Sequence, residues 1–180
     1  MQHEGKKIIL LLGGARSGKS ARAQQMAEEM GGRVLFCATA QPLDEEMLRR
    51  IEAHRKSRPS GWNTIEAPVD VGNKLVQSIS GYDTIIIDCI TLLISNCLCT
   101  GVSDREAAAA VSKEIESITR LMRQRDFNFI LVSNEVGSGL VPDNKLGRTY
   151  RDLLGQANQQ LAACADEVYF MAAGLSLKMK

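Results

Sequence analysis

Short runs of aliphatic residues alternate along this chain with longer segments that mix apolar and polar residues. The runs are typical of buried strands, and the mixed segments have the apolar spacing of amphipathic helices. Strands are predicted at 8–12, 33–38, 62–67, 84–89 and 128–134, with two terminal strands in 166–174 and 176–180. Helices are predicted at 19–30, 44–58, a short segment through Leu75, 104–125 and 143–163. The alternation predicts a three-layer α/β/α fold with a mostly parallel central sheet.

Local signals support several of these boundaries. Gly31 and Gly32 are expected to end the first helix. Asp44 can cap the second helix, and Pro59 stops it, because the residue before a proline avoids the helical conformation. The segment 84–89 is strongly β-branched, so it is predicted to be a central strand.

Composition excludes several broad classes of protein. The chain has 180 residues, which predicts a single domain spanning 1–180. Apolar residues make up 44% and charged residues 24%, and the net charge of +1 gives no long-range attraction to nucleic acid. The longest aliphatic run has five residues, far short of the ~20 that span a bilayer. The segment 1–7 lacks the apolar region of a signal peptide, so we expect a cytoplasmic protein with neither a membrane nor nucleic acid as partner.

The five cysteines form an odd set without a Cys-x-x-Cys pair or histidines at metal-binding spacing. They are Cys37, Cys89, Cys97, Cys99 and Cys164. We predict reduced thiols packed in the core. Cys97 and Cys99 lie in an apolar stretch, which favours burial of both, and a redox role for them is the alternative.

The most specific motif lies between the first predicted strand and the first helix. Gly13, Gly18, Lys19 and Ser20 complete the G-x-x-x-x-G-K-S/T spacing of a phosphate-binding loop. Glycines allow the backbone to curl around an anion with its N–H groups pointing inward. Lys19 can reach the β and γ phosphates, and the Ser20 hydroxyl can hold Mg²⁺. The alternative is a glycine turn without a ligand, but the flanking strand and helix favour nucleotide binding on a P-loop NTPase (RecA-like) fold.

Polar residues follow four of the predicted parallel strands, where ligands bind in such a sheet. Asp88 ends an apolar strand, and its carboxylate is predicted to hold Mg²⁺ or its water. A buried structural aspartate is the alternative. Glu66 and Glu135 are weaker candidates, because an acid at the end of a strand can cap the following turn. The other polar residues at these strand ends are Thr39, Gln41 and Asn134.

His54 lies in the predicted helix 44–58, on one face with Met47, Ile51 and Arg58. One interpretation is a histidine beside the core, with Arg58 in solvent. The other is a nucleophile, because imidazole, with a reference pKa of about 6.5, is largely neutral at pH 7 and can attack phosphorus. Arg58 would then offer a guanidinium fork to phosphate oxygens. The spacing alone does not distinguish the two interpretations.

Five segments together resemble one known family. They are GGARSGKS, ATAQPLDEEMLRRIEAHRKSRPSGW, IIIDCIT, NEVGSGLVPDN and NQQLAACADEVYFMAAGLSLKMK. They resemble the bifunctional adenosylcobinamide kinase/adenosylcobinamide-phosphate guanylyltransferase family, from about residue 8 onward. The segment around His54 and the NEVG-G-VP stretch are specific, because they do not belong to P-loop kinases in general. In that family the matching histidine forms a covalent guanylyl intermediate, so the resemblance favours the nucleophile interpretation of His54.

The resemblance implies two reactions on one scaffold. A nucleoside triphosphate, ATP or GTP, phosphorylates adenosylcobinamide, and GTP then donates GMP through His54 to that phosphate, giving adenosylcobinamide-GDP for cobalamin biosynthesis. It also suggests a homotrimer. By position, the family's nucleotide contacts fall on Gly13, Gly14, Ala15, Arg16, Ser17, Gly18, Lys19, Ser20, Thr39, Ala40, Gln41, Arg55, Lys56, Ser57, Arg58, Glu66 and Asp88. Of these, Ser20 and Asp88 are the predicted Mg²⁺ ligands.

Two other functions compete with this one. The first is a single-activity P-loop small-molecule kinase in which His54 is structural, and detection of a guanylylated protein would separate the two. The second is a recombinase-like or motor ATPase that acts on a nucleic-acid or protein partner. The nearly neutral charge, the aromatic content of 4% and the lack of a basic stripe argue against it.

Overall fold

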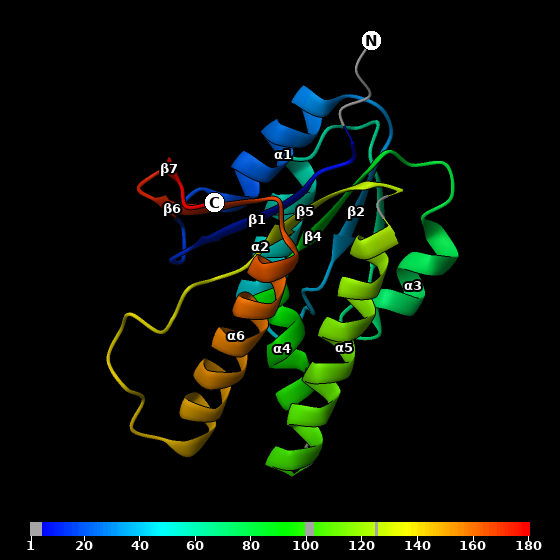
Figure 1. Ribbon diagram of the computed structural model, residues 1–180. Coiled ribbons are helices and arrows are strands. Elements are labelled where there is room, and N and C mark those ends of the chain that lie inside the picture. Colours follow the sequence, from blue (N-terminus) through cyan, green and yellow to red (C-terminus); the bar gives the residue numbers. More distant parts are fainter. Residues whose placement is uncertain (1–4, 100–102, 125) are drawn as a thin grey trace.

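A seven-stranded sheet forms the centre of the computed structural model, which describes residues 5–99, 103–124 and 126–180 (Figure 1). The strands are β1 (Ile8–Gly13), β2 (Val34–Ala38), β3 (Asn63–Glu66), β4 (Thr84–Asp88), β5 (Asn128–Val132), β6 (Glu167–Ala172) and β7 (Leu175–Lys178). They lie in the order β3-β2-β4-β5-β1-β6-β7. β1 to β6 are parallel, and β7 pairs antiparallel with β6. The prediction of a mostly parallel sheet is therefore confirmed.

The strand order brings the two strongest sequence candidates to one edge of the sheet. β1 ends at the phosphate-loop motif, β4 ends at Asp88, and β5 lies between these two strands. In the sheet register Asp88 stands opposite Ala38 of β2 and Val132 of β5. β4 is flanked by β2 and β5, so its predicted central position is also confirmed.

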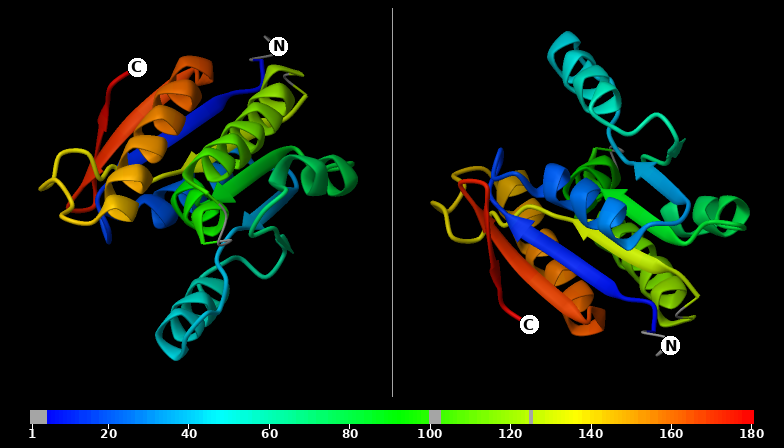
Figure 2. Two further views of the ribbon diagram at one scale, coloured as in Figure 1. Left: turned by 90° about the horizontal axis from the view of Figure 1, so that it is seen from below. Right: turned by 90° about the horizontal axis from the view of Figure 1, so that it is seen from above.

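The helices are divided unequally between the two faces of the sheet. They are α1 (Lys19–Met30), α2 (Glu45–Lys56), α3 (Val71–Ser78), α4 (Ile90–Leu98), α5 (Asp104–Gln124) and α6 (Lys145–Cys164). α1 covers one face, while α3, α4, α5 and α6 cover the other. α2 covers neither face and extends away from the sheet (Figure 2). The arrangement is a three-layer α/β/α fold, as predicted.

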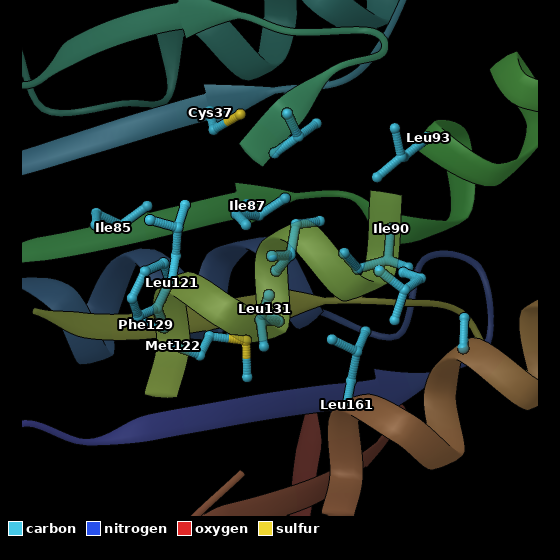
Figure 3. Packing of buried hydrophobic residues seen from close by; sticks show 14 of the residues in the cluster. Cys37, Ile85, Ile87, Ile90, Leu93, Leu121, Met122, Phe129, Leu131 and Leu161 are labelled. Atoms are coloured by element: carbon cyan, nitrogen blue, oxygen red, sulfur yellow. The ribbon is translucent and has the colours of Figure 1, made fainter. Parts of the chain in front are cut away.

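The larger part of the core lies between the sheet and the four helices of that second face. Ile87, Phe129 and Leu131 of the sheet are fully buried there, as is Leu161 of α6, and Leu121 of α5 is buried in the same cluster (Figure 3). Strands buried on both faces need apolar side chains on both sides, which explains the unbroken aliphatic runs in the sequence.

A smaller core cluster lies under α1. Ala23, Met26 and Ala27 of this helix pack on alternate residues of the sheet, among them Ile9 and Ile86. The two alanines are fully buried. Small side chains let the helix approach the strands closely, which fixes the position of the loop that precedes it.

One helix was missed by the sequence pattern. α4 (Ile90–Leu98) is mostly buried against its neighbours, and it carries no charged residue that would mark an outer face. Its apolar run therefore lacks the contrast that identifies an amphipathic helix. Some helix bounds also differ from the prediction: α2 ends at Lys56 instead of residue 58, and α6 spans Lys145–Cys164 instead of 143–163. The predicted end of α5 at Arg125 lies outside the described residues.

The prediction of buried cysteines is confirmed for some positions and wrong for one. Cys37 and Cys97 are buried, Cys89 and Cys164 are half-buried, and Cys99 is exposed. Cys99 follows the last helical residue of α4, so its side chain does not share the packed face of that helix. Burial raises the pKa of Cys37 to about 12 and that of Cys97 to about 11, so both thiols are protonated at neutral pH.

Within residues 5–99, 103–124 and 126–180, no helix is both long enough and apolar enough to cross a membrane.

Candidate functional site

The loop between β1 and α1 has the backbone of a phosphate cradle. Gly13 has a φ of 149°, and a Cβ atom built on it would lie 2.2 Å from the carbonyl oxygen of Met171. Gly18 is left-handed, with a φ of 94°, and immediately precedes α1. The N–H of Gly174, in the turn between β6 and β7, donates to the carbonyl of Ser17 at 3.1 Å. The loop is therefore held from the β6 side, and it opens at the N-terminus of a helix, where anions bind.

Lys19 lies folded within this loop. Its ammonium donates to the carbonyl oxygens of Gly13 at 3.0 Å and Gly14 at 2.5 Å, and to Ser17 Oγ at 3.2 Å. Burial lowers the pKa of Lys19, while the nearby Cys89 and Asp88 act in the opposite direction. Lys19 is thus the one buried charged side chain of the motif, and it lies beside the backbone that would surround a phosphate.

Asp88 lies across from the loop at the end of β4. Its carboxylate accepts a hydrogen bond from the Ser20 hydroxyl. Burial raises the pKa of Asp88, and Ser20, His54, Arg58 and Lys19 counteract this effect. The hydroxyl and carboxylate that the sequence predicted as metal ligands are therefore neighbours, and three cationic or potentially cationic side chains lie around them.

His54 reaches this group from α2, the helix that extends from the body. Asp44 caps the helix by accepting a hydrogen bond from Met47 N at 2.7 Å, as the sequence predicted. Met47 and Ile51 are half-buried, whereas the other side chains of α2, His54 among them, are exposed. His54 is exposed to solvent yet near enough to Asp88 to lower its pKa. A histidine beside the core is therefore not what the structure contains.

Arg58, just beyond the end of α2, is half-buried and does not point into solvent. Its guanidinium stacks on the ring of Phe36, with its central carbon 3.8 Å from the ring centre, and it donates to Thr64 Oγ1 at 3.2 Å. Its buried Nε has no hydrogen-bond partner. Burial lowers the pKa of Arg58, and Asp88 acts in the opposite direction. The interpretation that leaves Arg58 in solvent is therefore wrong, and Phe36 and Thr64 hold the guanidinium in place.

The remaining predicted contacts on α2 lie at the outer rim of the site. Arg55 forms an ion pair with Glu66 at the end of β3, with 2.6 Å between Nη2 and Oε1. Lys56 is exposed, and Ser57 Oγ donates to the His54 carbonyl at 2.9 Å, which closes the end of the helix. Arg55 and Ser57 are near His54 in the chain, but their side chains bond to Glu66 and to the backbone of the helix.

The segment after β2 is placed differently. Thr39 is fully buried, and its hydroxyl bonds to the backbone of Cys89. Ala40 and Gln41 are half-buried. Sequence reasoning missed Asn96 of α4, whose amide donates to the carbonyl oxygens of Thr39 and Pro68. The single amide within the apolar run ITLLISNCL is the signal that could have identified it.

The side chain of Glu135 stabilises the loop that follows β5. Its carboxylate accepts hydrogen bonds from the N–H groups of Gly137 at 2.7 Å and Ser138 at 3.3 Å. This is the turn-capping alternative that the sequence left open. Its own N–H donates to the carbonyl of Gly13 at 3.0 Å, so the residue ties this loop to the phosphate cradle.

The arrangement can neutralise the charge of a polyphosphate and position it for attack. Lys19 and Arg58 lie near Asp88 beside the glycine loop, and the Ser20 hydroxyl and the Asp88 carboxylate offer oxygen atoms to a metal ion. These features place the chain among the P-loop proteins of the α/β class. More narrowly, the chain belongs to the cobinamide kinase / cobinamide phosphate guanyltransferase family, which it matches over residues 9–179.

Curated relatives agree along nearly the whole chain. The bifunctional adenosylcobalamin biosynthesis protein CobU of Escherichia coli (strain K12) is 36% identical over 181 residues, covering 96% of this chain and 99% of that protein. The protein of the same name from Salmonella typhimurium is 38% identical with the same coverage. The bifunctional adenosylcobalamin biosynthesis protein CobP of Pseudomonas aeruginosa is 39% identical over 171 residues, covering 95% and 96%.

Proposed function

We propose that this protein is a bifunctional enzyme of cobalamin biosynthesis. It phosphorylates adenosylcobinamide with ATP or GTP, and it then transfers GMP from GTP to adenosylcobinamide phosphate, giving adenosylcobinamide-GDP and pyrophosphate. The membership of the chain in its family supports both activities. We also propose that the protein is cytoplasmic and that it forms a single nucleotide-binding domain.

The kinase half of the proposal uses the loop from Gly13 to Ser20. The backbone of the loop and the ammonium of Lys19 hold the phosphates, because phosphoryl transfer needs positioning and charge neutralisation more than covalent help. The Ser20 hydroxyl and the Asp88 carboxylate fit Mg²⁺, which takes one or two carboxylates and completes its ligands with substrate phosphates. When bound, Mg²⁺ supplies further neutralisation of the phosphate oxygens.

The transferase half uses His54 as the nucleophile. An imidazole nitrogen attacks the α phosphorus of GTP, so an N–P bond forms while the P–O bond to the β phosphate breaks and pyrophosphate leaves. A phosphate oxygen of adenosylcobinamide phosphate then attacks the same phosphorus, and the N–P bond breaks to restore the free imidazole. In both steps Arg58 neutralises the phosphate oxygens, a role that its fixed contacts with Phe36 and Thr64 support.

One observation carries this assignment. His54 is near enough to Asp88 to lower its pKa, although α2 extends away from the body of the protein and the two residues are far apart in sequence. This proximity, from a helix whose side chains are mostly exposed, supports a role for His54 at the phosphate site. The remaining nucleotide contacts that we propose are Ala15, Arg16, Ala40, Gln41, Arg55, Lys56, Ser57 and Glu66. Thr39 was also expected to contact the nucleotide, but it is fully buried and its hydroxyl bonds to the backbone of Cys89, so we do not propose it as a contact.

The test is covalent labelling of the protein with GTP that carries its label in the α phosphate. Wild-type protein should retain acid-labile label, and His54→Ala should retain none while it still folds and binds GTP, because the variant lacks only the nucleophile. Arg49→Ala is the matched control, since Arg49 is exposed on the same helix and pairs with Glu45. Label that persists in His54→Ala would rule out His54. Absence of label in the wild type would leave a single-activity kinase.

We also propose that the protein is a homo-oligomer, a homotrimer by its resemblance to the family. The edge strand β7 supports self-association, because Leu175 is 76% exposed, Leu177 67% and Met179 64%. Leu175 and Leu177 pair with Ala172 and Phe170 of β6, so they share one side of the sheet. Light scattering of the protein in solution measures the number of chains directly.

A further inference from the structure

The hydroxyl of Thr39 forms its hydrogen bonds with the protein backbone. It lies fully buried between the ends of β2 and β4. Oγ1 accepts a hydrogen bond from the N–H of Cys89 at 2.8 Å and donates to the carbonyl of the same residue at 2.7 Å. The N–H of Thr39 donates to the carbonyl of Asp88 at 3.1 Å. Three hydrogen bonds from one residue therefore hold the backbone of Asp88 and its neighbour.

Asn96 ties a third strand end to this group. Its Nδ2 donates to the carbonyl of Thr39 at 2.9 Å and to the carbonyl of Pro68, just beyond β3, at 2.8 Å. Both N–H groups of the amide are thus used by two loops. Asn96 belongs to α4, which begins directly after Cys89, so the helix and the ends of β2, β3 and β4 form one connected unit.

We propose that Thr39 and Asn96 are positioning residues that fix the orientation of the Asp88 carboxylate toward Ser20 and the metal–nucleotide complex. The hydroxyl of Thr39 therefore acts through Asp88 and makes no contact with the nucleotide. This inference rests on the proposed function only in assuming that the substrate is a nucleoside triphosphate with Mg²⁺.

Packing alone does not require a polar side chain at position 39, whereas the proposed role does. Valine has almost the same shape and would fill the same space in the core, but it offers no hydrogen bond. The direction of a carboxylate depends on the position of its backbone as well as on its own side-chain torsions, so a firmly held backbone narrows the directions in which it can point. The bonds of Thr39 to Cys89 and Asp88 supply that support.

The experiment measures the affinity for guanosine 5′-[β,γ-imido]triphosphate in EDTA and again in saturating Mg²⁺. In the wild type Mg²⁺ should tighten binding. In Thr39→Val this gain, the ratio of the affinity in Mg²⁺ to that in EDTA, should fall by on the order of tenfold, as is common when the support of a metal ligand is removed. The affinity of the variant in EDTA should stay at the wild-type value. Thr39→Ser keeps the hydroxyl and should restore the gain.

Thr119→Val is the matched control. Thr119 is also a buried threonine, but its hydroxyl donates to the Glu116 carbonyl within α5, at 3.1 Å. This variant should keep the wild-type affinity under both conditions. Asn96→Ala should reduce the Mg²⁺ gain as Thr39→Val does, and the double variant should lose less than the product of the two, because both residues act on one carboxylate. If Thr39→Val does not fold, the Thr39→Ser and Asn96→Ala variants decide the question.

Two results would overturn the inference. An equal loss of affinity in EDTA and in Mg²⁺ would identify Thr39 as a direct contact or as a purely structural residue. An unchanged Mg²⁺ gain in both Thr39→Val and Asn96→Ala would show that the network does not orient Asp88. Failure of the proposed function would look different, because wild-type protein would then show no Mg²⁺ gain and no labelling of His54.

Discussion

Gly13 is a position where a single methyl group decides whether the phosphate cradle can form. An added Cβ would lie 2.2 Å from a carbonyl oxygen of β6, and backbone cannot move aside as a side chain can. The neighbouring Gly14 has no atom within 4 Å of its would-be Cβ. The two glycines thus have different reasons to be present.

We predict that Gly13→Ala lowers the free energy of unfolding by about 2–3 kcal/mol. In a chain of this size that loss corresponds to a fall of roughly 4–12 °C in Tm. Gly14→Ala, the control, should change stability by about 0.5 kcal/mol or less. Thermal unfolding measured by circular dichroism compares the two, and equal stability of both variants would contradict the close approach at Gly13.

At this scale the sequence predicts what is local and misses what depends on folding. The loop between β1 and α1 was predicted correctly, because the spacing of its glycines is a local property of the chain. The partners of Arg58 were not, because Phe36 and Thr64 reach it from other strands. The role of Thr39 was equally hidden, since Cys89 lies 50 positions away in the sequence.

α1 and α2 are two helices of equal length with opposite surroundings. Each has 12 residues, but α1 buries Lys19, Ala23, Met26 and Ala27, whereas α2 has no buried residue. Met47 and Ile51 gave α2 the sequence pattern of a helix packed on the core. The pattern could not show that this side is only partly covered.

We predict that the amides of α2 exchange with solvent much faster than those of α1. A helix without buried side chains opens locally at little cost, so its protection should be lower by on the order of 100-fold. Hydrogen exchange followed by mass spectrometry measures both helices in one sample, and α1 is the internal control. Equal protection of the two would mean that α2 is held by more than its contacts at Arg55 and Arg58.

Across the whole molecule, the phosphate site reduces the stability of the fold. Burial raises the pKa of Asp88, so the unfolded chain loses this proton at lower pH than the native protein does. The two states are equally protonated below the ordinary pKa of 3.8. As pH rises through the raised native pKa, ionisation favours the unfolded state and native stability falls.

We therefore expect Asp88→Asn to be more stable than the wild type at pH 7 in EDTA, with a difference in Tm that shrinks toward pH 4. Asparagine can still accept the hydrogen bond from Ser20 and carries no charge. Asp152→Asn is the control, because the Asp152 side chain is 66% exposed. Thermal unfolding across this pH range is the measurement, and a less stable Asp88→Asn at pH 7 would contradict the expectation.

The order of the strands was beyond the reach of the sequence pattern. Alternating strands and helices predicted a parallel sheet, but nothing local places β5 between β1 and β4. That order depends on long-range packing, in which Phe129 and Leu131 of β5 meet α5 and α6 in the larger core. The sequence therefore predicted the parts of the site better than their arrangement.

The unequal covering of the sheet has a genetic consequence. α1 opens at the phosphate loop and is also the only helix, among the described residues, that covers its face of the sheet. Substitutions at Ala23 or Ala27 would loosen the fold and shift the loop together. Such alleles would mimic active-site lesions in cells grown warm and recover when the cells are cooled. Temperature-sensitive mutants are therefore expected to concentrate in this helix.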